Sequence, residues 1–269
     1  LIGANDLLVD DPQLRSTLTE ILPGLEILGV PAKSGQRVVY FAKILALDPS
    51  IAAQEDCESA LMMSKWGEVV LKVSDGFSHQ QISYLQREIE ILNRLNSRYF
   101  PELLYNDVFT ENPILDEPLA DRLFITIEEK IAGNPLSAKL TDYRTEKTVL
   151  ELLIELVKGL SLIWNATPKL IHRDIKPDNI IVRDNGDICI IDLGIAREQG
   201  SQGQTNTHDM FGPCTPRYCS PEQAKNDKKN VSFKSDFFSL GILSYELLTG
   251  KNPFVESVKT PVFKILENV

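Results

Sequence analysis

The sequence predicts an α+β protein of two lobes, a small antiparallel-sheet lobe followed by a mainly helical lobe. Two observations predict this class. Runs rich in β-branched and apolar residues recur through the first half of the chain, where turn residues separate them. Beyond about residue 145, apolar residues recur instead at intervals of three and four, as they do along one face of a helix. A chain of 269 residues is long enough for two small lobes or one large domain.

We expect a short helix in a leader ahead of the first lobe, and five strands and one helix within that lobe. The short helix falls at residues 11–21 of an acidic leader, and Pro23-Gly24 ends it. The apolar residues of 78–96 are spaced by three and four, which predicts the second helix. A connector of residues 45–67 separates the second strand from the third. The five predicted strands are residues 25–30, 37–44, 68–73, 103–109 and 123–130.

In the second lobe the pattern is helical. Residues 149–164 form a long amphipathic stretch. Residues 235–248 predict another helix, which Gly250 and Pro253 end. We expect the chain to cross between the lobes at Gly133-Asn134-Pro135. The predicted boundaries are a leader at residues 1–22, a first lobe at 23–132 and a second lobe at 133–269.

Composition narrows the classes of partner. The composition, with 43% hydrophobic and 25% charged residues, is typical of a globular protein. Its net charge of −10 argues against nucleic acid or an anionic membrane as the main partner, because both require a basic face. No apolar run approaches the length of a membrane span. The four cysteines show neither paired metal spacing nor a disulfide framework, so we expect a reducing cytoplasm.

The segment His172–Asn179 is the most informative part of the sequence. It places three polar side chains, Asp174, Lys176 and Asn179, on one short stretch. A further carboxylate, Asp192, follows an apolar run. Phosphoryl transfer from ATP needs a carboxylate to orient a hydroxyl group, a cation near the moving phosphate and oxygen ligands for Mg²⁺. These residues therefore predict a phosphotransferase; a polar turn that only caps local backbone groups is the alternative.

The two motifs resemble the catalytic loop and the Asp-Phe-Gly motif of protein kinases, with Leu193 in place of Phe. The resemblance extends over about residues 24–266 and implies the two-lobe fold of protein kinases, with ATP and Mg²⁺ as cofactors and proteins as substrates. By this resemblance Asp174 is the catalytic base and Lys176 steadies the transferred phosphoryl group. Asn179 and Asp192 hold Mg²⁺. The Lys-Pro pair at residues 176–177 is similar to serine/threonine kinases.

Upstream motifs extend the resemblance. Val69-Val70-Leu71-Lys72 is similar to the kinase strand motif that ends in a phosphate-contacting lysine, and the family's ion-pair partner for Lys72 falls at Glu88. In the phosphate-covering loop, Gly29 and Gly35 match the family pattern, but the middle glycine is missing and the spacing to Val38 differs. A plain hairpin turn is the alternative there.

The resemblance also implies an adenine site at the end of the fifth strand. The Glu129 carbonyl and the Ile131 N–H group would pair with adenine, and Val70 and Ile181 would contact its ring. Glu128 then falls at a position that is usually apolar or Thr in the family.

Further motifs follow Asp192. Residues 215–222 are similar to the peptide-binding loop and Ala-Pro-Glu motif, and Thr215 would bridge Asp174 and Lys176. Asp236 resembles the buried aspartate that anchors the catalytic loop; a favourable charge at a helix N-terminus is the second, compatible interpretation. Arg173 would pair with a phosphate on the stretch after residue 197. We therefore expect autophosphorylation at Thr205 or Thr207, and less so at Ser201.

Two other functions compete with a serine/threonine protein kinase. The altered glycine loop and Glu128 are compatible with a pseudokinase, a nucleotide-binding or scaffolding module without turnover. A kinase-like enzyme acting on a small molecule is the third, although the Lys176 and Thr215 features argue against it. In the family the second lobe continues beyond the helix of Asp236, and Glu222 pairs with an Arg there. The second lobe is therefore expected either to be cut short in the sequence given or to be completed by a further domain or partner at the C-terminal end.

Overall fold

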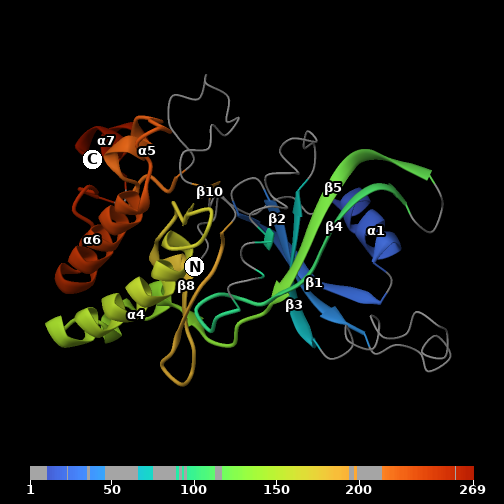
Figure 1. Ribbon diagram of the computed structural model, residues 1–269, viewed down its shortest axis with the longest axis horizontal. Helices are drawn as coiled ribbons and strands as arrows, with labels where there is room; N and C mark the ends of the chain where they lie inside the picture. The colour runs from blue at the N-terminus through green and yellow to red at the C-terminus, as the bar shows by residue number, and fades with distance from the viewer. Residues whose placement is uncertain are drawn as a thin grey trace. The chain divides into compact units, whose positions relative to one another are not determined.

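A computed structural model describes most of the chain, namely residues 11–22, 24–34, 37–45, 66–74, 89–90, 93, 96–112, 117–193, 197–198, 214–257 and 259–269. The chain forms two compact units, whose elements Figure 1 labels. Unit 1 comprises Leu1–Tyr84 and Glu102–Lys130, and unit 2 comprises Leu85–Pro101 and Ile131–Val269. The predicted crossing near residue 132 is therefore close to the observed one, but residues 85–101 belong to unit 2.

Unit 1 contains an antiparallel sheet of five strands in the order β1-β2-β3-β5-β4 (Figure 1). The strands are β1 (Leu25–Ser34), β2 (Arg37–Ile44), β3 (Glu68–Ser74), β4 (Leu103–Asn112) and β5 (Glu117–Glu129). All five predicted strands are confirmed. The first is longer than predicted, because pairing with β2 resumes after an irregularity between Leu28 and Ala32 and continues to Ser34.

One face of this sheet forms the apolar core of unit 1. Buried residues that alternate along β2, β3 and β5, such as Tyr40, Leu71 and Ile125, pack together there. The predicted first helix, α1 (Pro12–Ile21), covers the core with Leu18 and Ile21. Because its apolar side chains complete the core, the segment expected to be a separate leader is an integral part of unit 1.

Unit 2 is mainly helical. Its two long helices are α4 (Glu146–Trp164) and α6 (Phe233–Thr249), with N-caps Thr145 and Ser232. Gly250 ends α6 in the left-handed conformation with φ of 75°, as the sequence predicts. The shorter elements are η1 (Leu136–Ala138), η2 (Leu140–Asp142), η3 (Pro177–Asn179), α5 (Pro221–Ala224) and α7 (Val262–Asn268). Short strands form two small sheets, β6 (Asn134–Pro135) with β8 (Ile180–Val182) and β9 (Ile188–Ile190), and β7 (Leu170–Ile171) with β10 (Arg197–Glu198).

The predicted crossing at residues 133–135 carries a glycine for a steric reason. Gly133 has φ of 147°, and a Cβ atom there would lie 2.5 Å from the carbonyl oxygen of Val182. The absent side chain therefore lets the chain run against β8 as it enters β6.

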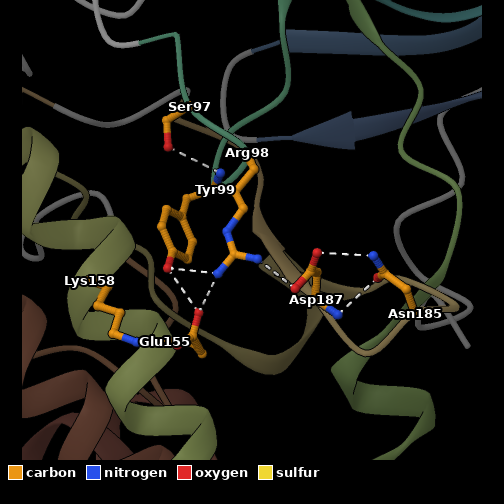
Figure 2. Close-up of polar contacts among 7 residues, drawn as sticks. All are labelled: Ser97, Arg98, Tyr99, Glu155, Lys158, Asn185 and Asp187. Atoms are coloured by element: carbon orange, nitrogen blue, oxygen red, sulfur yellow. Dashed lines mark hydrogen bonds and ion pairs between the residues drawn. The ribbon is translucent and has the colours of Figure 1, made fainter.

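The segment of residues 97–100 is attached to unit 2 by a polar network (Figure 2). The Arg98 guanidinium donates to Glu155 on α4 at 2.9 Å and to Asp187 in the turn between β8 and β9 at 2.6 Å. The Tyr99 hydroxyl donates to the same Glu155 carboxylate, and the Ile190 N–H group donates to the Tyr99 carbonyl at 2.7 Å. The segment therefore ties β9 to α4.

Several predicted segments lie wholly or partly outside the described residues. They include the connector at 45–67, most of the helix at 78–96 and most of the stretch between 197 and 215. Within the predicted helix, Ile89, Glu90 and Asn93 are helical. Among the helices that the structure describes, none has both the length and the apolar character that crossing a bilayer demands.

Candidate active site

The catalytic segment is an irregular stretch held in place by a buried carboxylate. Asp236, in the first turn of α6, is fully buried. Its side-chain oxygens accept hydrogen bonds from the backbone N–H groups of His172 at 3.0 Å and Arg173 at 2.8 Å. The Trp164 Nε1–H group donates to the same carboxylate at 2.8 Å. The predicted anchoring contact is thus confirmed, and it satisfies backbone donors that have no strand or helix partner.

Burial sets the electrostatics of this anchor. Removal from water raises the pKa of Asp236, while the nearby His172 and the three donated hydrogen bonds act in the opposite direction. Arg173, beside it, adopts a left-handed backbone with φ of 71°. Such a conformation is uncommon outside glycine and persists only where neighbouring contacts fix it. Here those contacts come from Asp236 and from Gln223, whose Nε2 group donates to the Arg173 carbonyl at 2.7 Å.

Three side chains meet at the predicted catalytic position and form a closed ring of hydrogen bonds. The Lys176 Nζ group donates to Asp174 Oδ2 at 2.8 Å and to Thr215 Oγ1 at 2.9 Å. The Thr215 hydroxyl donates to Asp174 Oδ1 at 2.6 Å. The bridging contact predicted for Thr215 is therefore confirmed, although Thr215 lies 41 residues along the chain from Asp174. The ring fixes the direction of the carboxylate and places a cation against it.

The two predicted metal ligands lie on adjoining pieces of chain. The backbone carbonyl of Asn179 accepts from the N–H group of Ile191, the residue before Asp192, at 2.9 Å. The Asn179 amide nitrogen donates to the carbonyl of Asp174 at 2.9 Å and to its Oδ2 at 3.1 Å, so Oδ1 is the Asn179 atom available to a cation. Asp192 has φ of 64°, a second left-handed residue at the site.

The ligand atoms of Asn179 and Asp192 are of the chemical type that Mg²⁺ prefers. An amide oxygen and a carboxylate are the hard oxygen ligands that this cation prefers, and Mg²⁺ commonly takes only one or two protein ligands beside substrate phosphates. Among the described residues, no group of three or more His, Cys, Asp or Glu side chains is arranged to hold a metal ion.

The segment after Thr215 is fixed by contacts that sequence reasoning missed. The Ser235 hydroxyl donates to Glu222 Oε1 at 2.5 Å, so a residue of α6 provides a partner for the carboxylate that was expected to pair with an arginine. The Ser239 hydroxyl donates to the Tyr218 carbonyl at 2.7 Å, and the Tyr218 hydroxyl contacts Glu246. Only the capping pattern at Ser232 and Ser235 signals this in the sequence, because the pattern places Ser235 on the first turn of α6.

In unit 1, Lys72 forms an ion pair that the sequence did not predict. Lys72 Nζ lies 2.7 Å from Glu128 Oε2, on the neighbouring strand β5. Both side chains are largely buried, with exposed fractions of 7% and 17%. The predicted partner, Glu88, lies outside the described residues. In the structure described, the carboxylate that neutralises Lys72 is therefore carried by the sheet.

Strand register revises the predicted nucleotide contacts. Val39 is paired with Lys72 and Val38 with Val73. Because successive side chains of a strand point to opposite faces, Val38 lies on the core face, where it packs against the apolar cluster. Val39, rather than Val38, shares the face of Lys72 and Val70. The residue spacing of the loop does not determine which face of the sheet a side chain occupies.

The predicted glycine loop is a strand pair rather than an open loop. Gly29 has φ of 65° and lies at the irregularity of β1, not at the turn. Its carbonyl accepts from Arg15 of α1 at 2.6 Å, so α1 supports the bulge. Gly35 lies outside the described residues, as do Ser201, Thr205 and Thr207.

The residues predicted to contact adenine fall in both units. Glu129 is the last residue of β5 and its N–H group donates to the carbonyl of Glu102 at 2.8 Å. Its carbonyl remains the group expected to face adenine. Ile131 opens the second part of unit 2, and Ile181 is a half-buried residue of β8.

Comparison with known proteins identifies the family. The model of the protein kinase domain matches residues 61–268. The chain belongs to the protein kinase family. The match begins after β2, so the hairpin with the altered glycine pattern is the part of the kinase-like region that the family model leaves out.

Curated relatives extend the comparison. The chain is 38% identical to a probable serine/threonine-protein kinase of Streptomyces coelicolor over 131 residues, 48% of this chain and 19% of that protein. It is 32% identical to the serine/threonine-protein kinase PknL of Mycobacterium tuberculosis over 191 residues, 69% of this chain and 44% of that one. It is 28% identical to the human Citron Rho-interacting kinase over 205 residues, 74% of this chain and 9% of that one. The chain thus spans less than half the length of each of these relatives.

Proposed function

We propose that this protein kinase domain transfers the γ-phosphoryl group of ATP to serine and threonine hydroxyl groups of protein substrates, with Mg²⁺. The observation that carries the proposal is the ring of Asp174, Lys176 and Thr215. Phosphoryl transfer requires little covalent chemistry from the protein, and its rate depends on positioning and on charge stabilisation. The ring supplies a positioned carboxylate and a positioned cation. The printed names of the relatives, which include serine/threonine-protein kinases, support the same substrate class.

Each side chain of the ring has a distinct task in this proposal. Asp174 accepts the proton of the substrate hydroxyl, which increases the nucleophilicity of the oxygen. Lys176 offsets negative charge on the phosphoryl group during transfer. Thr215 holds the carboxylate and the ammonium in one geometry by contacting both. Asp236 and Gln223 act through the backbone, which they hold in the conformation that presents Asp174.

The nucleotide would be bound by the remaining predicted residues. Lys72 would contact its phosphates, and Asn179 Oδ1 and the Asp192 carboxylate would hold Mg²⁺, which supplies charge neutralisation on the phosphate oxygens when bound. The Glu129 carbonyl and the Ile131 N–H group would pair with adenine. The apolar contacts assigned to its ring are Val70, Ile181 and, as the register requires, Val39 instead of Val38.

The test is phosphoryl transfer from γ-labelled ATP to peptide pools whose acceptor is Ser, Thr or Tyr. We expect label on the Ser and Thr pools only, loss of transfer when Mg²⁺ is chelated, and recovery when Mg²⁺ is restored. The Asp174→Asn variant, which keeps size and hydrogen bonding, is the control for contaminating kinases. Absence of transfer from the wild-type protein with ATP bound would instead favour the pseudokinase alternative, which nothing in the described site supports.

Autophosphorylation is a separate part of the proposal. Arg173 precedes Asp174, and hydroxyl residues lie on the stretch between residues 197 and 215. A phosphate at Thr205 or Thr207 would gain charge-assisted hydrogen bonds from arginine and order that stretch. Mass spectrometry after incubation with Mg²⁺ and ATP should find the phosphate there. A protein that transfers phosphate to peptides but carries none between residues 197 and 215 would refute this part alone.

A further inference from the structure

The carboxylate that pairs with Lys72 comes from a neighbouring strand of the sheet, and not from the helix that the family resemblance implies. The pair spans 56 residues of sequence and joins β3 to β5 at 2.7 Å. Its exposed fractions, 7% and 17%, are far below those of a second Lys–Glu pair, at 37% and 53%, which joins Lys130, the residue after β5, to Glu68 of β3. Strand β3 thus contributes one residue to an enclosed pair and one to a solvated pair.

Strand register explains why Lys72 reaches Glu128. Lys72 lies directly opposite Thr126, and Val70 lies directly opposite Glu128. Lys72 and Glu128 are therefore diagonal neighbours on one face of the sheet, a separation that two long side chains bridge easily. The buried Thr126 hydroxyl forms no hydrogen bond with any residue described. Lys72 thus pairs with its diagonal neighbour and not with the residue opposite.

Burial makes this partner necessary. The Lys72 side chain is only 7% exposed, and an unpaired charge on a side chain so deeply buried is strongly unfavourable. Glu128 removes that penalty with a charge-assisted hydrogen bond. Because Glu128 belongs to a continuous strand, its backbone is fixed by the ladder of β3 and β5. Among the residues that the structure describes, the contact that holds the ammonium therefore lies within unit 1.

We propose that Glu128 is a positioning residue for the reaction: it is the carboxylate partner that aims Lys72 at the ATP phosphates, a task assigned by sequence to Glu88. The inference rests on the proposed function, since it concerns the same phosphoryl transfer. Glu128 does not contact ATP in this account and acts through Lys72. The positioning role also explains why a charged residue occupies a position where the family usually has an apolar residue or Thr.

The experiment compares Glu128→Gln with Glu68→Gln and Glu88→Gln. Glu68→Gln is the matched control, because it removes the exposed ion pair of Lys130 with Glu68, a residue of the same strand β3 as Lys72. The first readout is the rate of Lys72 acetylation by acetic anhydride, followed by mass spectrometry in the absence of nucleotide. We expect Glu128→Gln to increase Lys72 acetylation at least about threefold, because the ammonium loses its shielding carboxylate. Glu68→Gln should leave it unchanged, and Glu88→Gln should have a smaller effect than Glu128→Gln.

The second readout is transfer to a peptide. Glu128→Gln should lower kcat/KM about tenfold to a hundredfold, as expected for loss of a hydrogen bond between charged groups. Glu68→Gln should be equal to wild type. In a Lys72→Met background, Glu128→Gln should cause no further loss in ATP affinity, since the residue it acts through is gone. Glu128→Asp, which keeps the charge on a shorter side chain, should recover part of the activity and serves as the second variant if Glu128→Gln unfolds.

The outcomes separate the two hypotheses. An active wild-type protein in which Glu128→Gln and Glu128→Asp leave both Lys72 acetylation and transfer unchanged would overturn the positioning role only. The same holds if Glu88→Gln has the larger effect on Lys72. A wild-type protein that binds no ATP and transfers no phosphate would overturn the proposed function, and the positioning role with it, even where acetylation still detects the ion pair.

Discussion

The catalytic segment of unit 2 and the β3–β5 strand pair of unit 1 both present charged side chains, but they hold them by different means. The backbone of residues 172–174 has no ladder of its own and is held by side chains from other elements, Asp236 of α6 and Gln223 of α5. Lys72 and Glu128 stand on strands whose backbone hydrogen bonds already fix them. The backbone of an irregular segment therefore depends on individual buried side chains, whereas the backbone of a strand is held by its ladder and not by any one side chain.

The largest effect should come from the residue that the catalytic segment presents. Asp174→Asn keeps the shape of the side chain but removes the base, so transfer should fall about 10²–10⁴-fold, the usual contribution of a positioned general base. ATP affinity, measured by fluorescence titration, should change little, because Asp174 acts on the acceptor. Transfer within tenfold of wild type would show that another group activates the hydroxyl.

The anchor of the catalytic segment is the next most sensitive position. Asp236→Ala leaves two backbone N–H groups and the Trp164 Nε1–H group without their acceptor in a buried site. We expect a loss of about 3–5 kcal/mol in the free energy of unfolding, measured by urea denaturation, together with loss of transfer. Asp184→Ala, at an exposed turn of the same unit, is the control and should change stability by less than about 0.5 kcal/mol. Equal effects of the two changes would contradict the anchoring role.

In the strand pair, removal of a buried polar group should raise the free energy of unfolding, whereas Asp236→Ala lowers it. Thr126 lies opposite Lys72, is 1% exposed, and its hydroxyl forms no hydrogen bond with any residue described. Thr126→Val replaces an unsatisfied buried hydroxyl with a methyl group of similar size and higher strand propensity. We expect stability to rise by about 1 kcal/mol in urea denaturation. A loss of 1 kcal/mol or more would mean that the hydroxyl is satisfied in solution, and that strands here depend on side chains as the catalytic segment does.

The smallest effect is expected at the exposed network of Figure 2. Arg98 is 53% exposed even though it contacts both Glu155 and Asp187. Exposed ion pairs contribute little because water and salt screen them, so Arg98→Ala should lower the melting temperature by no more than about 2 °C. The difference from wild type should shrink further in 1 M salt. A larger, salt-independent change would show that the Tyr99 segment needs Arg98 in addition to its backbone bond to Ile190.

Much of the site could be predicted because its members are close in sequence. Asp174, Lys176 and Asn179 lie within six residues, so the local chain brings them together whatever the rest of the molecule does. The strands could also be predicted, because both the alternation of apolar residues with a period of two and the turn residues at the strand ends are local signals. Gly250 ended α6 as predicted, because the need for a left-handed residue there is local too.

Only the tertiary structure decided the partners of those residues. Register determined that Lys72 meets Glu128 and that Val39, not Val38, shares its face, and a shift of one residue would reverse both. The contact of Gln223 with Arg173 joins residues whose own segments give no sign of it, and the capping pattern of α6 places Ser235 on the first turn without revealing Glu222 as its partner. The sequence by itself thus determined the chemistry that the chain carries and the elements that carry it. Long-range packing decided which buried group neutralises which, because that choice depends on residues brought together only when the chain folds.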